Sequence, residues 1–495
     1  MHIIRYFIQD KFNLIYPFFL VNLLLLANLL TGQEVPGLTF GGLQDEAGIS
    51  LCKDGSGGYV LVGTTRSFGS GSNDVYIIKI DENLREEWTQ TIGTSHQEFA
   101  RSIFQISDGY LISGKSFDPQ DGPRGTLLIK IDKSGNLIFE RTYGLEFRDI
   151  GHSVIETSDK DIVVLGYTRA LKPFGTVRIF KTDSEGEEIW DYDYGFERDE
   201  YAYEIIEDIH GDYVFVGTRD GFFDDVHANY KNHDADLWIS KIKSDGTEVF
   251  SNTFGSTGHD FGNCIEEIED GYMVLGSTQS YGNGSFDMSL MKLSTEGDSI
   301  WQKTFGEEDF DYGLSLSVNA VGDIFMLGTS GSFSTDGTTE MLLYKTDNEG
   351  NEIWRLTLGG EKNEWGNSVV YTEDGGCVVL GTSDSYGAGM NDVFVTKISS
   401  DGEIESYSSN IEKKISKHII SPNPTRNYAR INLPDQSSDI YTLKIYTLNG
   451  IEVKNKEIGD SSKQIYTSSL ASGTYIYTLT NTKNDTMVSG KLIIY

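Results

Sequence analysis

The sequence predicts an all-β protein, a closed seven-bladed β-propeller followed by a small C-terminal β-sandwich. Two observations indicate the propeller. Each repeat unit holds four short runs rich in β-branched and aromatic residues and bounded by Gly, Asp, Ser and Asn, and no segment keeps a 3.6-residue apolar period. The unit is also repeated, because a Gly that closes a Thr-Phe-Gly-like step recurs at Gly41, Gly93, Gly144, Gly195, Gly255, Gly306 and Gly359.

The four runs of the first unit are 49–52, 59–64, 75–80 and 87–92. Asp-Gly turns such as Asp108-Gly109 and Asp270-Gly271 separate the first two runs of a unit, as in a tight hairpin. Four antiparallel strands in roughly 40–50 residues, repeated four to eight times, are typical of propeller blades. The repeats therefore predict a propeller over residues 34–407.

The two ends of the repeat region indicate how the ring closes. Thr39-Phe40-Gly41 precedes the first unit and matches the end of a fourth strand. The last unit's own fourth run, 403–407, lacks the aromatic residue and the closing Gly of the other units. We therefore expect residues 35–40 to add to the last blade.

Every unit carries a Lys on its third run and an acid five residues after its first Gly. The acid follows the Lys of the preceding unit by 19 residues in all six consecutive pairs of units, and buried charges usually occur in pairs. A charged ring around a ligand is the alternative, but sevenfold repetition suits a blade interface better. The spacing predicts the inter-blade ion pairs Lys79–Glu98, Lys130–Asp149, Lys181–Glu200, Lys241–Asp260, Lys292–Asp311, Lys345–Glu364 and Lys397–Glu46.

One position varies between fixed neighbours, reading Ile49, Arg101, His152, Tyr203, Asn263, Leu314 and Asn367 through the units. A variable, mostly polar site suggests exposure at the channel mouth. We therefore take Arg101, His152, Tyr203 and Asn263 as a candidate ligand-facing arc, with ordinary solvated positions as the alternative.

The loops between second and third strands carry aromatic residues in a polar setting, among them Phe68, Phe222, Tyr281 and Tyr386. Such a rim can stack on sugars or hold a peptide, although these rings can equally plug their own loops. No catalytic residue, metal-ligand spacing or cofactor motif is recognisable, so we expect no metal and no cofactor.

Composition and the N-terminus point to export. The formal net charge of −35 repels phosphate backbones, so nucleic acid is an unsuitable partner. Residues 1–33 have basic residues, a Leu-rich run and a small polar end, which predict a secretory signal peptide, with an uncleaved anchor helix as the rival. No other segment is long and apolar enough to span a membrane, so none is expected once the signal is removed.

Two family resemblances follow from these residues. The phrase Asp74-Val75-Tyr76-Ile77-Ile78-Lys79-Ile80-Asp81, followed by Trp88 and Gly93, resembles the bacterial beta-propeller repeat of exported proteins. That resemblance implies a propeller fold and an undefined binding role, and it transfers no catalytic residue.

After a polar linker at 408–418, residues 419–495 resemble a type IX secretion system C-terminal sorting domain. The matching pieces are Ser421-Pro422-Asn423-Pro424, Leu443-Lys444-Ile445-Tyr446, Ser472-Gly473-Thr474-Tyr475 and the terminal Gly490-Lys491-Leu492. The resemblance implies a Bacteroidota-type bacterium, the type IX machinery as a partner, and secretion or surface attachment through the periplasm.

Together these features predict a secreted or surface propeller that binds a glycan, peptide or protein. A secreted polysaccharide hydrolase or lyase is the alternative, because propellers host such chemistry.

Overall fold

The computed structural model describes residues 37–405 apart from 71, 119–121, 145–148, 170–174, 196–198, 220–234 and 335–336, and in the C-terminal region 420–421, 428–431, 441–447, 452–458, 464–467, 470–471, 473–480 and 486–494. The chain divides into two compact units, Met1–Ser406 and Tyr407–Tyr495. The signal sequence predicted at 1–33 lies outside the described residues, and so does the linker predicted at 408–418. The described residues form strands and connecting loops, and no helix with the length and hydropathy to span a bilayer is found among them.

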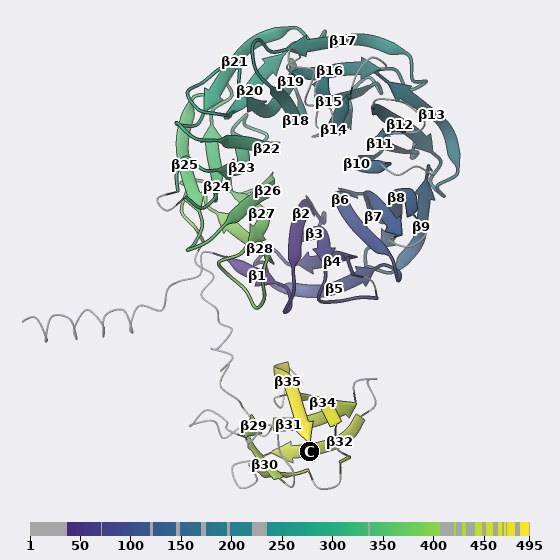
Figure 1. The fold of residues 1–495 in the computed structure, drawn as a ribbon, viewed down its shortest axis with the longest axis vertical. Coiled ribbons are helices and arrows are strands. Elements are labelled where there is room, and N and C mark those ends of the chain that lie inside the picture. Colours follow the sequence, from purple (N-terminus) through teal and green to yellow (C-terminus); the bar gives the residue numbers. More distant parts are fainter. Residues whose placement is uncertain are drawn as a thin grey trace, which may run out of the picture. The chain divides into compact units, whose positions relative to one another are not determined.

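Seven four-stranded antiparallel sheets surround a central channel (Figure 1). Six of them take their strands in chain order from the innermost outward. They are β2–β5 (Glu46–Lys53, Tyr59–Thr65, Asp74–Ile80, Glu86–Ile92), β6–β9 (Gln97–Gln105, Gly109–Asp118, Gly122–Asp132, Leu137–Tyr143), β10–β13 (Ile150–Glu156, Ile162–Thr168, Thr176–Thr182, Glu188–Tyr194), β14–β17 (Tyr201–Glu207, Tyr213–Arg219, Asp236–Ile242, Glu248–Phe254), β18–β21 (Asp260–Ile268, Gly271–Thr278, Asp287–Leu293, Ser299–Phe305) and β22–β25 (Asp311–Val318, Ile324–Ser330, Glu340–Thr346, Glu352–Leu358).

The seventh sheet is closed by the other end of the propeller. Its strands β26 (Glu364–Tyr371), β27 (Cys377–Ser383) and β28 (Asp392–Ile398) are joined by β1 (Leu38–Phe40), which pairs antiparallel with β28. Thr39 faces Phe394 in this register. The expected closure of the ring by the N-terminal segment is therefore confirmed for residues 38–40, and β28 is not left as an open edge.

The core is a ring of apolar clusters, each shared by two neighbouring blades. The middle strands of a blade are buried on both faces, whereas the outermost strand is buried only in part. Val60 of the first blade and Ile112 of the second belong to one such cluster. Because one blade cannot cover both of its own faces, the blades are stable only as a stack.

Hydroxyl groups fasten the inner strands to each other around the channel. Ile103 donates its backbone N–H to Ser50 Oγ at 3.4 Å, Val369 to Ser315 Oγ at 3.1 Å, and Leu51 to Ser368 Oγ at 3.3 Å. The last of these bonds joins the first blade to the seventh. The inner strands are thus linked by side chains where no strand ladder runs between blades.

The repeated lysines do not form the predicted inter-blade pairs. Each pairs with an acid in the turn between the first and second strands of its own blade. The Nζ–Oδ distances are 3.2 Å for Lys79–Asp54, 3.7 Å for Lys130–Asp108, 2.9 Å for Lys181–Asp159, 2.6 Å for Lys241–Asp208, 2.8 Å for Lys292–Asp270, 2.9 Å for Lys345–Asp323 and 2.7 Å for Lys397–Asp374.

Position along the strand explains why the predicted pairing is wrong. Glu98 donates its backbone N–H to Asn73 O, six residues before Lys79 on the chain. Six residues of a strand span about 20 Å. The repeated Lys and the predicted acid therefore lie at opposite ends of the blade, and their constant spacing reflects the repeat length alone.

The repeated acids Glu46, Glu98, Asp149, Glu200, Asp260, Asp311 and Glu364 are all buried. Glu46 shows a role that other members share, since it accepts hydrogen bonds from Thr65 Oγ1 at 2.8 Å, from Ser67 N at 2.9 Å and from Gly42 N at 2.6 Å. Glu364 makes the equivalent contacts with its own loop. These carboxylates fix the loops between second and third strands.

The C-terminal unit is also all-β where it is described. One sheet contains β29 (Ile420–Ser421), β30 (Tyr428–Ile431) and β33 (Gln464–Tyr466). The other has the order β32-β31-β34-β35, with bounds Glu452–Ile458, Tyr441–Thr447, Gly473–Thr480 and Thr486–Ile494. The fold class predicted from the sequence is confirmed.

Candidate binding site at the channel mouth

The variable position of the repeat coincides with a β-bulge in every inner strand. The pairing register shifts between Gly48 and Ser50, between Ala100 and Ser102, and at the equivalent place in the other five blades. The skipped residue is the variable one. A bulge residue is left out of the ladder and its side chain is re-aimed, so this position is free to differ between blades.

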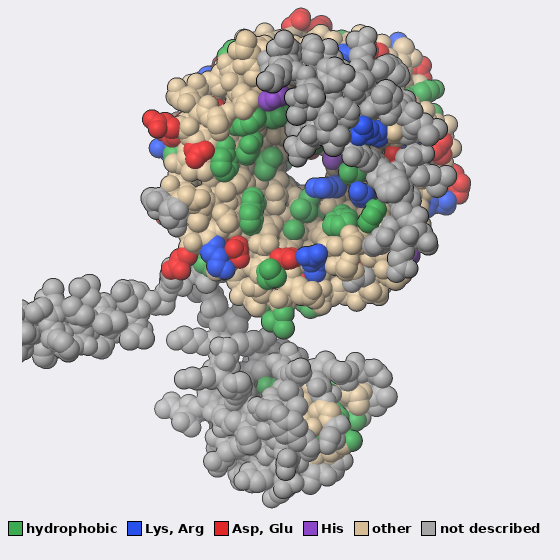
Figure 2. Space-filling view, viewed as in Figure 1, with side chains coloured by type: hydrophobic (Ala, Val, Ile, Leu, Met, Phe, Trp, Pro, Cys, Tyr) green, Lys and Arg blue, Asp and Glu red, His purple; other side chains and the backbone are tan. Residues whose placement is uncertain are grey.

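The seven bulge residues line one cavity of about 410 Å³. The structure therefore brings together the predicted arc of Arg101, His152, Tyr203 and Asn263, which come from four consecutive blades. The other three blades contribute Ile49, Leu314 and Asn367. Figure 2 shows the channel open along its axis, with basic side chains beside the opening.

The polar arc has unusual electrostatics for so acidic a protein. Burial, together with the charge of Arg101, lowers the pKa of His152 to about 3, so its imidazole is neutral at physiological pH. Desolvation also lowers the pKa of Arg101, and burial raises that of Tyr203. The His152 and Tyr203 rings meet edge to face at 5.5 Å between centroids. This end of the channel therefore offers one cation and two neutral polar rings.

A second cavity of about 460 Å³ adjoins the first. It shares Ile49 and Arg101 with the channel cavity and extends to Arg66 of the first blade and to Gln97 and Phe99 of the second. Arg66 is neutralised there by Asp45, with 3.0 Å between Nη1 and Oδ2. Arg101 therefore lines both cavities at the channel mouth.

Sequence reasoning missed a set of aromatic residues beside the bulge. The position between the fixed acid and the fixed small residue is aromatic in five blades, as Phe99, Tyr201, Phe261, Tyr312 and Trp365. All five are partly exposed. Their place two residues before each variable position was the signal that could have found them.

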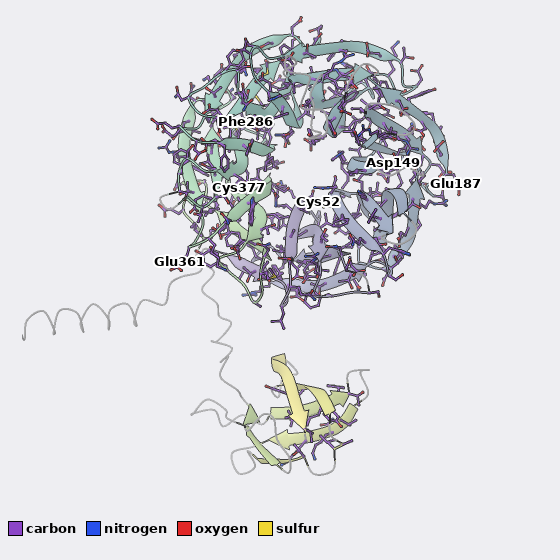
Figure 3. The ribbon with its side chains drawn as sticks, in the orientation of Figure 1. Cys52, Asp149, Glu187, Phe286, Glu361 and Cys377 are labelled. Carbon is purple, nitrogen blue, oxygen red and sulfur yellow. The ribbon has the colours of Figure 1, made fainter. Side chains whose placement is uncertain are left out.

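Three of these aromatic residues belong to the two cavities, since Phe261 and Tyr312 line the channel cavity and Phe99 lines the adjoining one. Phe286, labelled in Figure 3, packs between Phe261 and Tyr312 at centroid distances of 5.6 Å and 5.0 Å. Phe286 thus holds the rings of Phe261 and Tyr312 in position.

The predicted loop rim lies apart from this site. Phe68 and Tyr281 are 42% and 44% exposed, but neither lines the two cavities. Tyr386 donates its hydroxyl to Gly359 O, just after β25, at 2.8 Å and packs near Phe394, so its ring is held against the propeller. Phe222 lies outside the described residues.

On the neighbouring inner strands β14 and β18, two acids accept an inter-blade N–H of the kind that serines accept in other blades. Glu204 Oε2 accepts from Ile265 N at 2.7 Å, and Glu266 Oε2 accepts from Val318 N at 2.8 Å. Burial raises the pKa of Glu266 to about 8. Glu266 also lines a cavity of about 770 Å³ on the side of the Asp-Gly turns.

Two further features bear on chemistry. Within the described part of the chain, no three or more His, Cys, Asp and Glu side chains form a group that could hold a metal ion. The three cysteines are free, and burial raises the pKa of each thiol, which makes them poor nucleophiles. Figure 3 shows Cys52 and Cys377 in different blades.

The comparisons define the class of protein. Residues 419–495 match the family described as the secretion system C-terminal sorting domain. The chain is therefore a β-propeller that carries a type IX sorting domain, and this domain marks it for secretion and attachment at the cell surface. No curated protein matches the chain.

Several solved structures are similar to this chain at low identity. The extracellular domain of BT4673 from B. thetaiotaomicron, described as a one-component system, is 13% identical with a TM-score of 0.40, and the alignment covers 92% of this chain and 58% of that one. The propeller domain of the Trilobed protease from Pyrococcus furiosus is 11% identical with a TM-score of 0.42, covering 74% and 96%. YCF48 bound to D1 peptide is 10% identical with a TM-score of 0.45, covering 73% and 96%. The chain spans less than two thirds of the first of these.

Proposed function

We propose that this protein is a binding module presented at the cell surface, and that its ligand enters the mouth of the central channel. The observation that carries the proposal is the convergence of the variable bulge residues on one cavity of about 410 Å³. The other repeated residues close the ring, pack the apolar core between blades or hold the loops between second and third strands in place. Ligand sites are concave, partly aromatic and provided with a few polar groups, and this cavity has those properties.

A steric block tests the proposal. The secreted protein is screened against glycan and peptide arrays, and each hit is then measured with Leu314→Trp, which fills the mouth from a position where side chains of many sizes already occur. Leu43→Trp is the matched control, because Leu43 is 83% exposed and lines neither cavity. Binding should fall at least tenfold in the first variant only. Hits that bind both variants equally would place the ligand elsewhere.

The sorting domain supports delivery to the surface, and it can be tested separately. Removing residues 419–495 should leave the propeller in the periplasm. Surface labelling of cells that express the full and the truncated chain distinguishes the two locations, and undiminished labelling of the truncated chain would contradict the proposal.

A polysaccharide-active enzyme is the second candidate, favoured by Glu204 and Glu266 on neighbouring inner strands. A carboxyl with a pKa of about 8 is suited to act as a general acid. Both carboxylates, however, accept an inter-blade N–H in the way that Ser50 and Ser315 do. Release of reducing ends from a polysaccharide by the purified protein, abolished in Glu266→Gln, would favour the enzyme.

A further inference from the structure

Among the described residues, Arg101, Arg85 and Arg219 have no carboxylate oxygen within ion-pair distance, and of these three Arg101 lines the channel cavity. Arg66, Arg141 and Arg355 each have a nitrogen within 4 Å of a carboxylate oxygen. Among the described residues, no acid pairs with Arg101 in this way. This is notable in a chain with 75 acids and 40 bases, where a neutralising carboxylate would be easy to supply.

Arg101 lies where an anion from solvent can reach it. Its side chain is exposed to the channel, and the surrounding protein desolvates the guanidinium enough to lower its pKa. A desolvated charge is unfavourable unless it is paired. An anion that arrives from solvent would therefore gain the pairing energy that the protein itself leaves unused.

The groups around Arg101 fit a planar carboxylate. Arginine presents a rigid fork of N–H donors that matches the two oxygens of a carboxylate. His152 is neutral, so one of its ring nitrogens carries a hydrogen and can donate a hydrogen bond to the carboxylate, while Arg101 supplies the positive charge. The Tyr203 hydroxyl stays protonated because burial raises its pKa, and it is a further donor on the same arc.

The rest of the lining suits a sugar. Phe261 and Tyr312 line the same cavity with partly exposed aromatic rings. Asn263 and Asn367 donate their Nδ2 groups to Gly313 O at 2.6 Å and to Gly48 O at 2.7 Å. The amides are thereby held in place, and their Oδ1 atoms are left as acceptors for hydroxyl groups. Stacking faces next to fixed acceptors recognise a polyhydroxylated ring better than a peptide.

We propose that the channel mouth binds an acidic glycan, with the carboxylate of a uronic acid residue held by Arg101. The inference rests on the proposed function and names its ligand class. The sugar rings lie against Phe261 and Tyr312, and Phe99 extends the contact surface into the adjoining cavity.

The test uses the full secreted chain and three probes of equal length: trigalacturonic acid, its methyl ester and galactotriose. Calorimetry should show binding of trigalacturonic acid and at least tenfold weaker binding of the other two. Arg101→Gln should weaken the acid probe on the order of 10–100-fold, since a hydrogen bond to a charged group contributes about 1.5–3 kcal/mol. Arg355→Gln, on an outer strand, is the matched control and should change nothing.

The outcomes separate this inference from the proposed function. Equal binding of acid and ester, or unchanged binding in Arg101→Gln, overturns the carboxylate assignment. If galactotriose binds and Leu314→Trp abolishes it, the inference fails while the channel remains the binding site. If a Glu-rich peptide binds through Arg101 and the three glycans do not, the glycan class is wrong. If Leu314→Trp affects no ligand of any kind, the proposed function fails as well.

Discussion

Replacing Lys241 by Met should destabilise the propeller strongly, because it leaves a buried carboxylate without its cation. Lys241 Nζ lies 2.6 Å from Asp208 Oδ2, and the Asp208 side chain is only 1% exposed. Methionine keeps most of the apolar stem. The substitution therefore removes the charge with little loss of packing.

The magnitude follows from the contacts that Asp208 retains. Removing one partner of a buried ion pair costs about 3–5 kcal/mol. Asp208 still accepts the backbone N–H groups of His210 and Asp212 and the hydroxyl of Tyr272 at 3.2 Å. We therefore expect a loss near the lower end, about 3 kcal/mol.

Lys292→Met is the matched control, because it stands at the same repeat position in the next blade. Its partner Asp270 is 61% exposed, so water can solvate that carboxylate once the lysine is gone. An exposed pair contributes at most about 1 kcal/mol. Guanidinium unfolding at pH 7 should show the difference as a shift in midpoint at constant slope.

Two results would refute this reasoning. Equal losses in the two lysine variants would show that burial of the carboxylate does not decide the cost. In the double variant Lys241→Met/Asp208→Asn, removal of the charge should recover part of the loss, so a simple sum of the two single losses would contradict the argument. The pKa of Asp208 is lowered in the fold, so its contribution is present above about pH 4 and is lost as the pH falls through the folded pKa.

Three further predictions concern the ring. Deleting residues 37–40 should expose β28, lower the unfolding midpoint and promote dimers, which size-exclusion chromatography would detect. Gly41→Ala would place Cβ 1.8 Å from Asp392 Oδ1, so it should destabilise by about 1–3 kcal/mol in denaturant titrations, and by less when Asp392 is also Ala. Burial and the charge of Asp311 raise the pKa of Asp287, so the stability that Asp287 contributes is full below about pH 4 and is lost as the pH rises through its folded pKa. In parallel denaturant titrations, the stability of Asp287→Asn relative to the parent should therefore improve from pH 3 to pH 7.

The fold could be predicted because each of its determinants is local and repeated. Four strand-like runs per unit and the Asp-Gly turns specify a blade, and the recurrence of the unit specifies the ring. The closure could also be predicted, since Thr39-Phe40-Gly41 completes a pattern that residues 403–407 lack. The structure adds the reason for the repeated Gly, because at Gly41 a side chain would collide with the carboxylates of Asp392 and Glu46.

The ion pairs were mispredicted because a repeat makes every spacing constant. In such a chain the acid of the next unit follows each Lys by the same interval, as Glu98 follows Lys79, whether or not the two lie close in space. The direction of the strands decides which acid is near. Partners within one blade are close in space whatever the repeat length, so an acid of the same blade is the better prediction when a candidate acid recurs in every unit.

The same logic explains why the variable position was informative. A residue in the ladder of an inner strand packs against the next blade, and the repeat constrains it accordingly. The bulge releases one residue per blade from that constraint while keeping it at the channel. Arg101, His152 and Tyr203 could therefore diverge without loss of the fold, whereas Glu204 and Glu266, which sit at fastening positions, still accept the inter-blade N–H that serines accept elsewhere. Specificity in this propeller is thus expected at the bulges, where side chains change and the backbone does not.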